Sequence, residues 1–191
     1  MKTFEIKGQK RAEITKQEVK ALRLNEMVPC VLYGGEDQIH FSVPAFDFRG
    51  LIYTPEVHLV NIAVEGKEYT ATLQDIQFHP VTDAINHIDF LLVQPNKPIT
   101  MSIPVKMTGV SEGVKQGGKL VAKVRRLKVQ GMPNEMPDFI SVDISNMKIG
   151  SSVRVRDINV KGITFLDSPA NVIVSVNMTR NVVAETAADK K

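Results

Sequence analysis

Short runs in which apolar and polar residues alternate occupy most of this 191-residue chain, and they restrict the folds open to it. Residues 69–74 alternate in this way, as do the runs 101–107, 140–144 and 172–176. A period of two is typical of strands with one buried face. Glycines and prolines separate the runs, as expected at turns. The sequence therefore predicts a mainly β protein.

The best-marked hairpin lies in the first half of the chain. Residues 57–64 and 69–74 flank Glu65-Gly66-Lys67, a tight-turn sequence. The alternation changes phase at Gln74-Asp75, which predicts a β-bulge or the end of the strand. Further strands are predicted at residues 29–33, 38–43 and 87–92.

One helix has a clear start. Thr15 and Glu18 have the spacing of a capping box, in which each side chain bonds to the other residue's backbone amide. The helix is expected to run to about Asn25 and to stop before Pro29. A second short helix is predicted at residues 45–52.

Two prolines at positions 95 and 98 mark the best domain boundary. The chain is therefore expected to hold an N-terminal domain at 1–94 and a second β domain at 95–179 without a clear helix. Residues 180–191 are polar, and they are expected to form a disordered tail.

Several classes of protein are excluded by composition. No apolar run approaches the roughly 20 residues that span a bilayer, and the N-terminus lacks the apolar core of a signal peptide. Cys30 is the only cysteine, so we expect a reducing compartment and a small core residue at that position. Tryptophan is absent and aromatic residues make up 6%, which argues against an aromatic-rich platform for stacking bases.

The formal net charge of +3 conceals an uneven distribution. Residues 1–23 hold 7 Lys/Arg against 3 Asp/Glu, a net charge of +4, and we interpret them as a basic N-terminal arm and helix. Residues 24–95 hold 2 against 10, a net charge of −8. Residues 96–191 hold 15 against 8, a net charge of +7.

Three cations of the capped helix fall on one stripe, because Lys16, Lys20 and Arg23 are spaced i, i+4 and i+7. Arg11 leads into this helix. Such a stripe is either a solvated surface or a set of phosphate contacts, and both interpretations stay open at this point.

A second group of cations lies in the C-terminal half, at Lys123, Arg125, Arg126 and Lys128. Alternation sends these side chains to both faces of a strand, so we expect an edge strand or an exposed ribbon. Either a binding surface or a strand edge protected by charge against aggregation would account for this group of cations.

Candidate catalytic groups are few. His79, His87 and Asp89 lie close in sequence, but no cysteine or third histidine stands at ligand spacing. His87 and Asp89 share one sheet face, which favours hydrogen bonding to a partner. We therefore expect no metal, no cofactor and no enzymatic activity.

Three segments resemble motifs of bacterial large-subunit ribosomal proteins that bind 5S rRNA: residues 28–35 (VPCVLYGG), 74–80 (QDIQFHP) and 87–90 (HIDF). A fourth, residues 113–118 (GVKQGG), resembles a motif of the longer, two-domain members of the general-stress (Ctc) type. The resemblance spans about residues 3–178.

The resemblance implies an N-terminal β-barrel with two or three short helices, followed by a second β-rich domain. It also implies that the barrel binds the loop E region of 5S rRNA in its widened minor groove. The implied RNA-binding residues are Arg11, Lys16, Lys20, Arg23, Tyr33, Gln77, His87 and Asp89. Ala21 and Phe78 stand at positions that are usually basic in the family.

The leading interpretation is a structural component of the large ribosomal subunit in the cytoplasm. Its expected partners are 5S rRNA and other large-subunit components, with no membrane and no small-molecule substrate. Two alternatives are a cytosolic β-rich protein-interaction adaptor without RNA binding, suggested by the acidic 24–95 segment, and a metal-dependent hydrolase that uses His79, His87 and Asp89.

Overall fold

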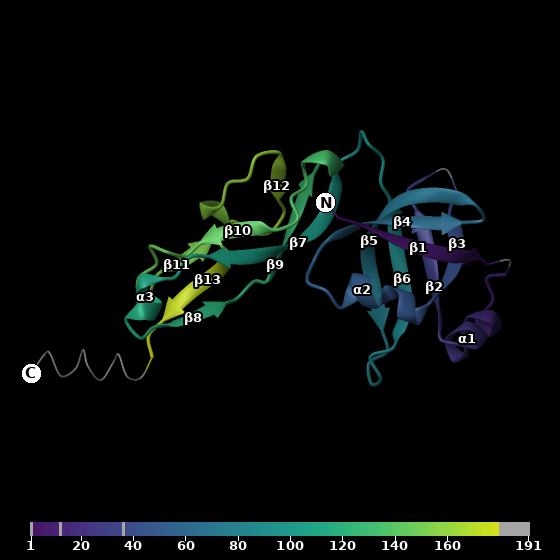
Figure 1. Ribbon diagram of the computed structural model, residues 1–191, viewed down its shortest axis with the longest axis horizontal. Coiled ribbons are helices and arrows are strands. Elements are labelled where there is room, and N and C mark those ends of the chain that lie inside the picture. The colour runs from purple at the N-terminus through teal and green to yellow at the C-terminus, as the bar shows by residue number, and fades with distance from the viewer. Residues whose placement is uncertain (1, 12, 36, 180–191) are drawn as a thin grey trace, which may run out of the picture. The chain divides into compact units, whose positions relative to one another are not determined.

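The computed structural model describes residues 2–11, 13–35 and 37–179, and it is mainly β, with 48% strand and 15% helix (Figure 1). One compact unit holds residues up to Met101 together with 132–134. The other holds residues 102–131 and the described residues from Glu135 onward. The predicted tail at 180–191 lies outside the described residues.

The first unit is a closed six-stranded barrel, as the resemblance implied. Around the barrel the strands run in the order β1-β3-β2-β6-β5-β4. Their bounds are β1 Lys2–Lys10, β2 Met27–Tyr33, β3 Ile39–Pro44, β4 His58–Val64, β5 Lys67–Phe78 and β6 Ile85–Leu92.

The interpretation of the first residues as a basic arm is wrong, because β1 is a barrel strand. It pairs in parallel with β4, from Lys2 opposite His58 to Gly8 opposite Val64, and antiparallel with β3 (Figure 1). Ile6 is buried and Phe4 packs against the core. Their alternation with lysine and glutamate was a strand signal within a charged sequence.

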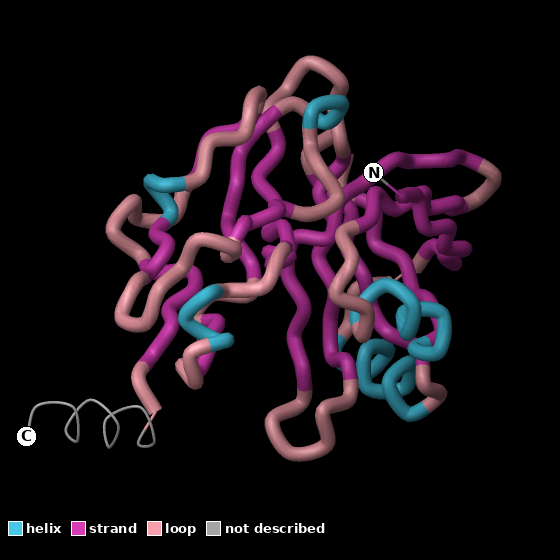
Figure 2. Tube along the Cα trace, turned by 60° about the vertical axis from the view of Figure 1, so that its left-hand side comes forward, coloured by secondary structure: helices cyan, strands magenta, loops and turns pink. Residues whose placement is uncertain are grey.

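The helices of this unit are close to their expected positions. Helix α1 spans Lys16–Leu24, with Thr15 as the N-cap that accepts from the Glu18 amide at 3.3 Å. The second predicted helix consists of a 3-10 turn, η1 Ala45–Phe48, and α2 Arg49–Ile52. Figure 2 shows these helical segments of the barrel unit near one another at one end of the barrel.

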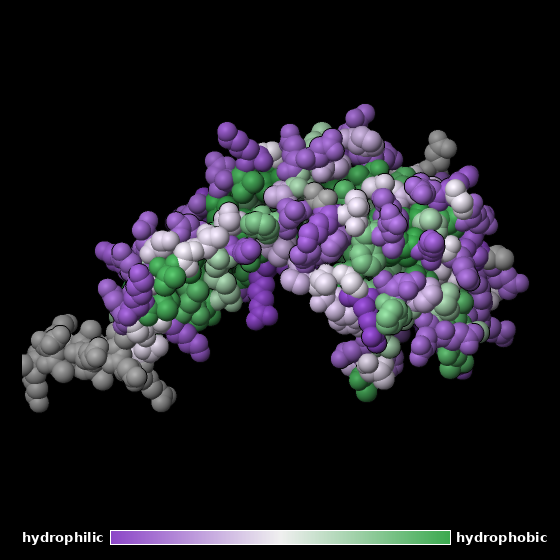
Figure 3. Space-filling view, viewed as in Figure 1, coloured by the Kyte–Doolittle hydropathy of each residue, from purple (hydrophilic) through white to green (hydrophobic). Residues whose placement is uncertain are grey.

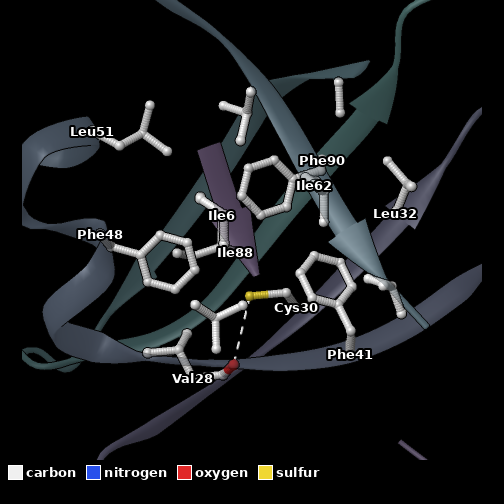
Figure 4. Packing of buried hydrophobic residues seen from close by; sticks show 14 residues of the cluster. Ile6, Val28, Cys30, Leu32, Phe41, Phe48, Leu51, Ile62, Ile88 and Phe90 are labelled. Carbon is white, nitrogen blue, oxygen red and sulfur yellow. Dashed lines mark hydrogen bonds between the residues drawn. The ribbon is translucent and has the colours of Figure 1, made fainter. Parts of the chain in front are cut away.

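Apolar side chains from all six strands and the η1–α2 segment fill the barrel (Figure 4). Phe41, Phe48 and Phe90 lie near its centre, with ring centroids 6.0 and 6.4 Å from Phe90. Cys30 is fully buried among them, as predicted, and burial raises the pKa of its thiol far above the ordinary value.

The second unit consists of two sheets. One has the order β10-β7-β9-β12 and the other β11-β13-β8. Their bounds are β7 Ile99–Thr108, β8 Lys119–Ala122, β9 Arg126–Gly131, β10 Ile140–Asp143, β11 Ser152–Arg154, β12 Ile163–Phe165 and β13 Val172–Asn177. The expectation of no clear helix after residue 95 needs a correction, since short helical turns are present at α3 Glu112–Lys115, η2 Pro133–Glu135 and η3 Val155–Asp157.

Candidate nucleic-acid interface

A β-bulge builds the polar face of the barrel. The pairing register of β5 with β6 shifts between Leu73 and Asp75. Gln74 is therefore the extra residue, at the position where the sequence predicted a bulge. Ile76 therefore packs against the core, while Asp75 and Gln77 point outward. Without the bulge, the second half of β5 would present its apolar residues to solvent.

Four of the residues implied by the resemblance meet on this outer face. Gln77 of β5 lies opposite His87 of β6, and Asp75 lies opposite Asp89. On the other side of β6, Val31 of β2 lies beside Asp89, and the alternation of β2 turns Tyr33 outward as well. The face thus combines Tyr33, Asp75, Gln77, His87 and Asp89.

Asp75 was not predicted from the sequence as a residue of this face. The change in alternation at Gln74-Asp75 was the signal that could have found it, because it puts Asp75 on the same face as Gln77. Partial burial, followed by the charges of Asp89 and Asp75, raises the pKa of the Tyr33 hydroxyl above 10.0. Tyr33 therefore keeps its proton at physiological pH and is available as a hydrogen-bond donor.

His87 and Asp89 form a close pair, with 2.6 Å between Nδ1 and Oδ1 and with 27% and 30% of their side chains exposed. An ionised carboxylate only accepts, so His87 Nδ1 is the donor. This hydrogen bond fixes the ring and leaves its Nε2 for an external partner.

The basic stripe on α1 is an unneutralised surface. Lys16, Lys20 and Arg23 line one shallow depression with Val19 and Leu24. Within the described part of the chain, none of these three cations forms an ion pair. Their positive charge is thus available to a polyanion.

Arg23 also joins this helix to the polar face. Its Nε and Nη2 donate to the Asn86 carbonyl at 3.2 and 3.0 Å, one residue before His87 in β6. A neutral carbonyl holds the guanidinium in place without cancelling its charge. The stripe and the polar face are therefore adjacent parts of one surface.

Arg11 differs from the other implied contacts. Its side chain is only 5% exposed, and it donates to both carboxylate oxygens of Glu18 at 3.2 and 3.1 Å. The hydrogen bond from Arg11 is the main reason that the pKa of Glu18 is lowered; burial opposes this shift, while the Arg11 charge and the Thr15 amide add to it. Arg11 holds α1 in position, and a direct RNA contact by Arg11 stays a prediction.

The remaining cations near the N-terminus are partly neutralised. Lys2 pairs with Glu56 at 2.6 Å and Lys10 with Glu65 at 2.9 Å. These pairs tie the two ends of β1 to the segment before β4 and to the turn after it. Of the seven Lys/Arg residues in 1–23, Lys2, Lys10 and Arg11 are thus paired with carboxylates, and three of the other four lie on α1.

The expectation of an edge strand in the second unit is wrong. Strand β9 lies between β7 and β12, and residues 123–125 connect β8 in one sheet to β9 in the other. The alternation of buried and exposed residues restarts after this connection, because the chain leaves one sheet and enters the other. In β9, Leu127 and Val129 are the buried residues. Nevertheless, all four cations, Lys123, Arg125, Arg126 and Lys128, are exposed.

The proposed catalytic histidines do not form a centre. His79 Nδ1 accepts from the amides of Val81 and Thr82 at 3.4 and 3.2 Å, so it stabilises the turn between β5 and β6. Among residues 2–11, 13–35 and 37–179, no three metal-ligating side chains come together. No helix in these ranges is long and apolar enough to cross a membrane.

A closed barrel with a polar outer face, beside a helix whose Lys16, Lys20 and Arg23 form no ion pair with any described residue, defines a small β-barrel binding domain. Two family models match the chain. The Ribosomal L25p family matches residues 6–90, and the C-terminal domain of ribosomal protein TL5 matches residues 98–180.

Relatives of known name agree with these matches. Large ribosomal subunit protein bL25 of Cytophaga hutchinsonii is 45% identical over 191 residues, which is 100% of both chains. The protein of the same name from Porphyromonas gingivalis is 44% identical over 193 residues and 100% of both chains. That of Christiangramia forsetii is 47% identical over 185 residues, 96% of this chain and 84% of its own.

The chain belongs to the bL25 family of large ribosomal subunit proteins. This confirms the family that the four motifs indicated. It is a family of structural components and not of enzymes.

Proposed function

We propose that this protein is a structural component of the large ribosomal subunit on cytoplasmic ribosomes, and that it binds 5S rRNA at loop E through the barrel. The observation that carries the proposal is the adjacency of the α1 stripe and the polar face, joined by Arg23 and Asn86. The family of the chain supports the ribosomal role.

The two parts of this surface have complementary tasks in RNA recognition. The minor groove of A-form RNA is wide and shallow and exposes 2′-hydroxyls and base edges. Tyr33, Gln77, His87 and Asp89 offer it both donors and acceptors. The cations of α1 neutralise phosphates, which sets position and register more than sequence.

The acidic residues of the barrel are compatible with this role. Exposed charges farther apart than a Debye length, roughly 8 Å at physiological salt, are largely screened. Asp89, which lies on the face itself, already accepts from His87. In the second unit, Lys123, Arg125, Arg126 and Lys128 would add a contact with other large-subunit components.

The test is an equilibrium binding titration of the full chain with transcribed bacterial 5S rRNA at several salt concentrations. We expect binding whose log affinity falls linearly with log salt, with about 0.7–0.9 units of slope for each neutralised phosphate. A 5S rRNA with its loop E replaced by a Watson–Crick helix is the control, and we expect it to bind more weakly. No binding at low salt would favour the protein-interaction adaptor.

A further inference from the structure

A second depression lies beside the proposed RNA-binding surface and is not part of its polar face. It has a volume of about 360 Å³, near the lower end of the range of about 300–1,000 Å³ for small-molecule sites. Its walls come from the end of α1, from η1 and α2, and from the start of β6. Figure 2 shows these helices at the same end of the barrel.

Two large aromatic side chains line this depression and remain open to solvent. Phe46 is 70% exposed and Tyr53 is 65% exposed. Hydrophilic side chains cover much of the visible surface of the barrel unit (Figure 3). Two exposed aromatic rings in one depression therefore indicate a surface that a partner covers.

The same depression carries a positive charge. Arg49 lies with its Cζ 5.0 Å from the centroid of the Phe46 ring, and Arg23 lines the adjoining wall. Glu26 is the carboxylate among the lining residues, and no described residue forms an ion pair with Arg49. Arg49 is also one of only two Lys/Arg residues between positions 24 and 95.

Aromatic rings beside unpaired arginines match one ligand chemistry. A nucleobase stacks on an aromatic ring, and its phosphate pairs with a guanidinium. An acidic peptide would use the arginines but would leave the two rings with no specific role. The charge and the rings together favour a nucleotide.

The position of the depression favours RNA from the same partner. Arg23 and Asn86 line it and also join the α1 stripe to the polar face. We propose that this depression, which we call the Phe46–Tyr53 site, binds an unstacked nucleotide of the RNA, with the base on Phe46 or Tyr53 and the phosphate at Arg49. This inference rests on the proposed 5S rRNA binding.

The experiment measures 5S rRNA binding by the full chain carrying Phe46→Ala and Tyr53→Ala together. Loss of base stacking predicts at least about fivefold weaker binding with an unchanged salt slope, since neither side chain is charged. Arg49→Gln is expected to weaken binding and also to lower the slope by about 0.7–0.9 units. Ultraviolet crosslinking of the wild-type complex should yield an RNA adduct on the peptide that holds Phe46 or Tyr53.

Phe139→Ala is the matched control, because Phe139 is also exposed and carries a cation, Lys106, 5.1 Å from its ring centroid in the second unit. Circular dichroism of each variant checks that it is folded.

Wild-type affinity in the Phe46/Tyr53 variant would overturn the site, and the proposed function would stand if Arg23→Ala still weakened binding. Failure of the wild type to bind 5S rRNA would overturn both. Wild-type RNA affinity with loss of ribosome association would assign the site to a protein neighbour and also overturn the inference.

Discussion

At the residue scale, hydrogen-bond partners give different roles to side chains that look equivalent in the sequence. Arg11 and Arg23 are both arginines of the basic N-terminal stretch. Arg11 is buried against the Glu18 carboxylate, which cancels its charge, whereas Arg23 is held by a neutral carbonyl and keeps its charge. We therefore expect Arg23 to contact phosphate and Arg11 to position the helix.

Arg23→Ala should weaken 5S rRNA binding by about 1–3 kcal/mol and lower the salt slope by roughly one unit, because one phosphate contact is lost. Titrations at several salt concentrations measure both quantities. Lys67→Ala is the control. It removes the same charge at the turn between β4 and β5, outside the proposed RNA-binding surface, and should have little effect on binding. Identical binding of Arg23→Ala and wild type at all salt concentrations would contradict this contact.

Asp89→Ala should weaken RNA binding with little change in salt slope, because it removes an acceptor and frees the His87 ring rather than removing a cation. The same titration measures this, with Glu68→Ala on β5 as a control that removes an exposed carboxylate. A changed slope with unchanged affinity would exclude polar readout by Asp89.

At the scale of single elements, β1 and α1 position the proposed binding surface. Strand β1 closes the barrel between β3 and β4, so it fixes the point at which the chain enters α1. The Arg11–Glu18 pair then ties the end of β1 to α1, which packs against β2. Under the proposed function, both elements would therefore affect RNA binding through the position of the cationic stripe.

Gly8→Ala should destabilise the barrel by about 1–3 kcal/mol, because a Cβ at this position would lie 2.5 Å from Cδ2 of the buried Phe41 ring. Urea denaturation measures the loss in the free energy of unfolding. Gln9→Ala changes the neighbouring exposed residue and should have a small effect. Equal stability of Gly8→Ala and wild type would mean that β1 does not pack as described.

The Glu18 carboxyl makes the docking of α1 dependent on pH. Its pKa in the folded protein lies below 4.5, so its contribution to stability is present above that value and is lost as the pH falls through the folded pKa. We expect Glu18→Gln to have a lower Tm than wild type at pH 7, and the difference to shrink below about pH 4. Thermal melts across this range measure it, and a difference that grows on acidification would contradict the ion pair.

At the scale of the whole molecule, charge is divided between the two units. The barrel unit is acidic overall and carries on α1 three cations that form no ion pair with any described residue, while the surplus positive charge of the chain lies in residues 96–191. A protein of low net charge can therefore bind a polyanion through a local surface.

Replacing Lys123, Arg125, Arg126 and Lys128 by glutamine together should leave the affinity for isolated 5S rRNA within about twofold, since the proposed contact lies on the barrel. It should release the protein from purified large subunits at a lower salt concentration. Sedimentation of subunits after salt washes measures this. Weaker 5S rRNA binding without earlier release would assign these cations to 5S rRNA instead.

Much of this structure was predictable from local sequence. Alternation predicted the mainly β fold, the hairpin of β4 and β5, and the bulge at Gln74, because side chains on a strand alternate between faces. The capping box predicted α1 to within a residue. The motifs predicted the family and named four residues that the fold brings together on one face.

Other features depended on contacts between distant residues. That β1 is a strand and not an arm, and that Arg11 is paired and not free, follows from partners that tertiary packing supplies. The basic run at 123–128 crosses between two sheets, because the chain before it pairs with β13 and the chain after it pairs with β7. The Phe46–Tyr53 site joins helices and a strand up to about 60 residues apart, so neither the low aromatic content nor any local pattern revealed it.

Local sequence was enough to predict helix α1, most of the strands other than β1, and the family of the chain, because these depend on residue types at short spacing. The tertiary structure alone decided which cations remain unpaired and which side chains share a surface. Ion pairs and surface patches form between residues that the fold brings together. The positions of these residues along the chain do not show which of them will be neighbours.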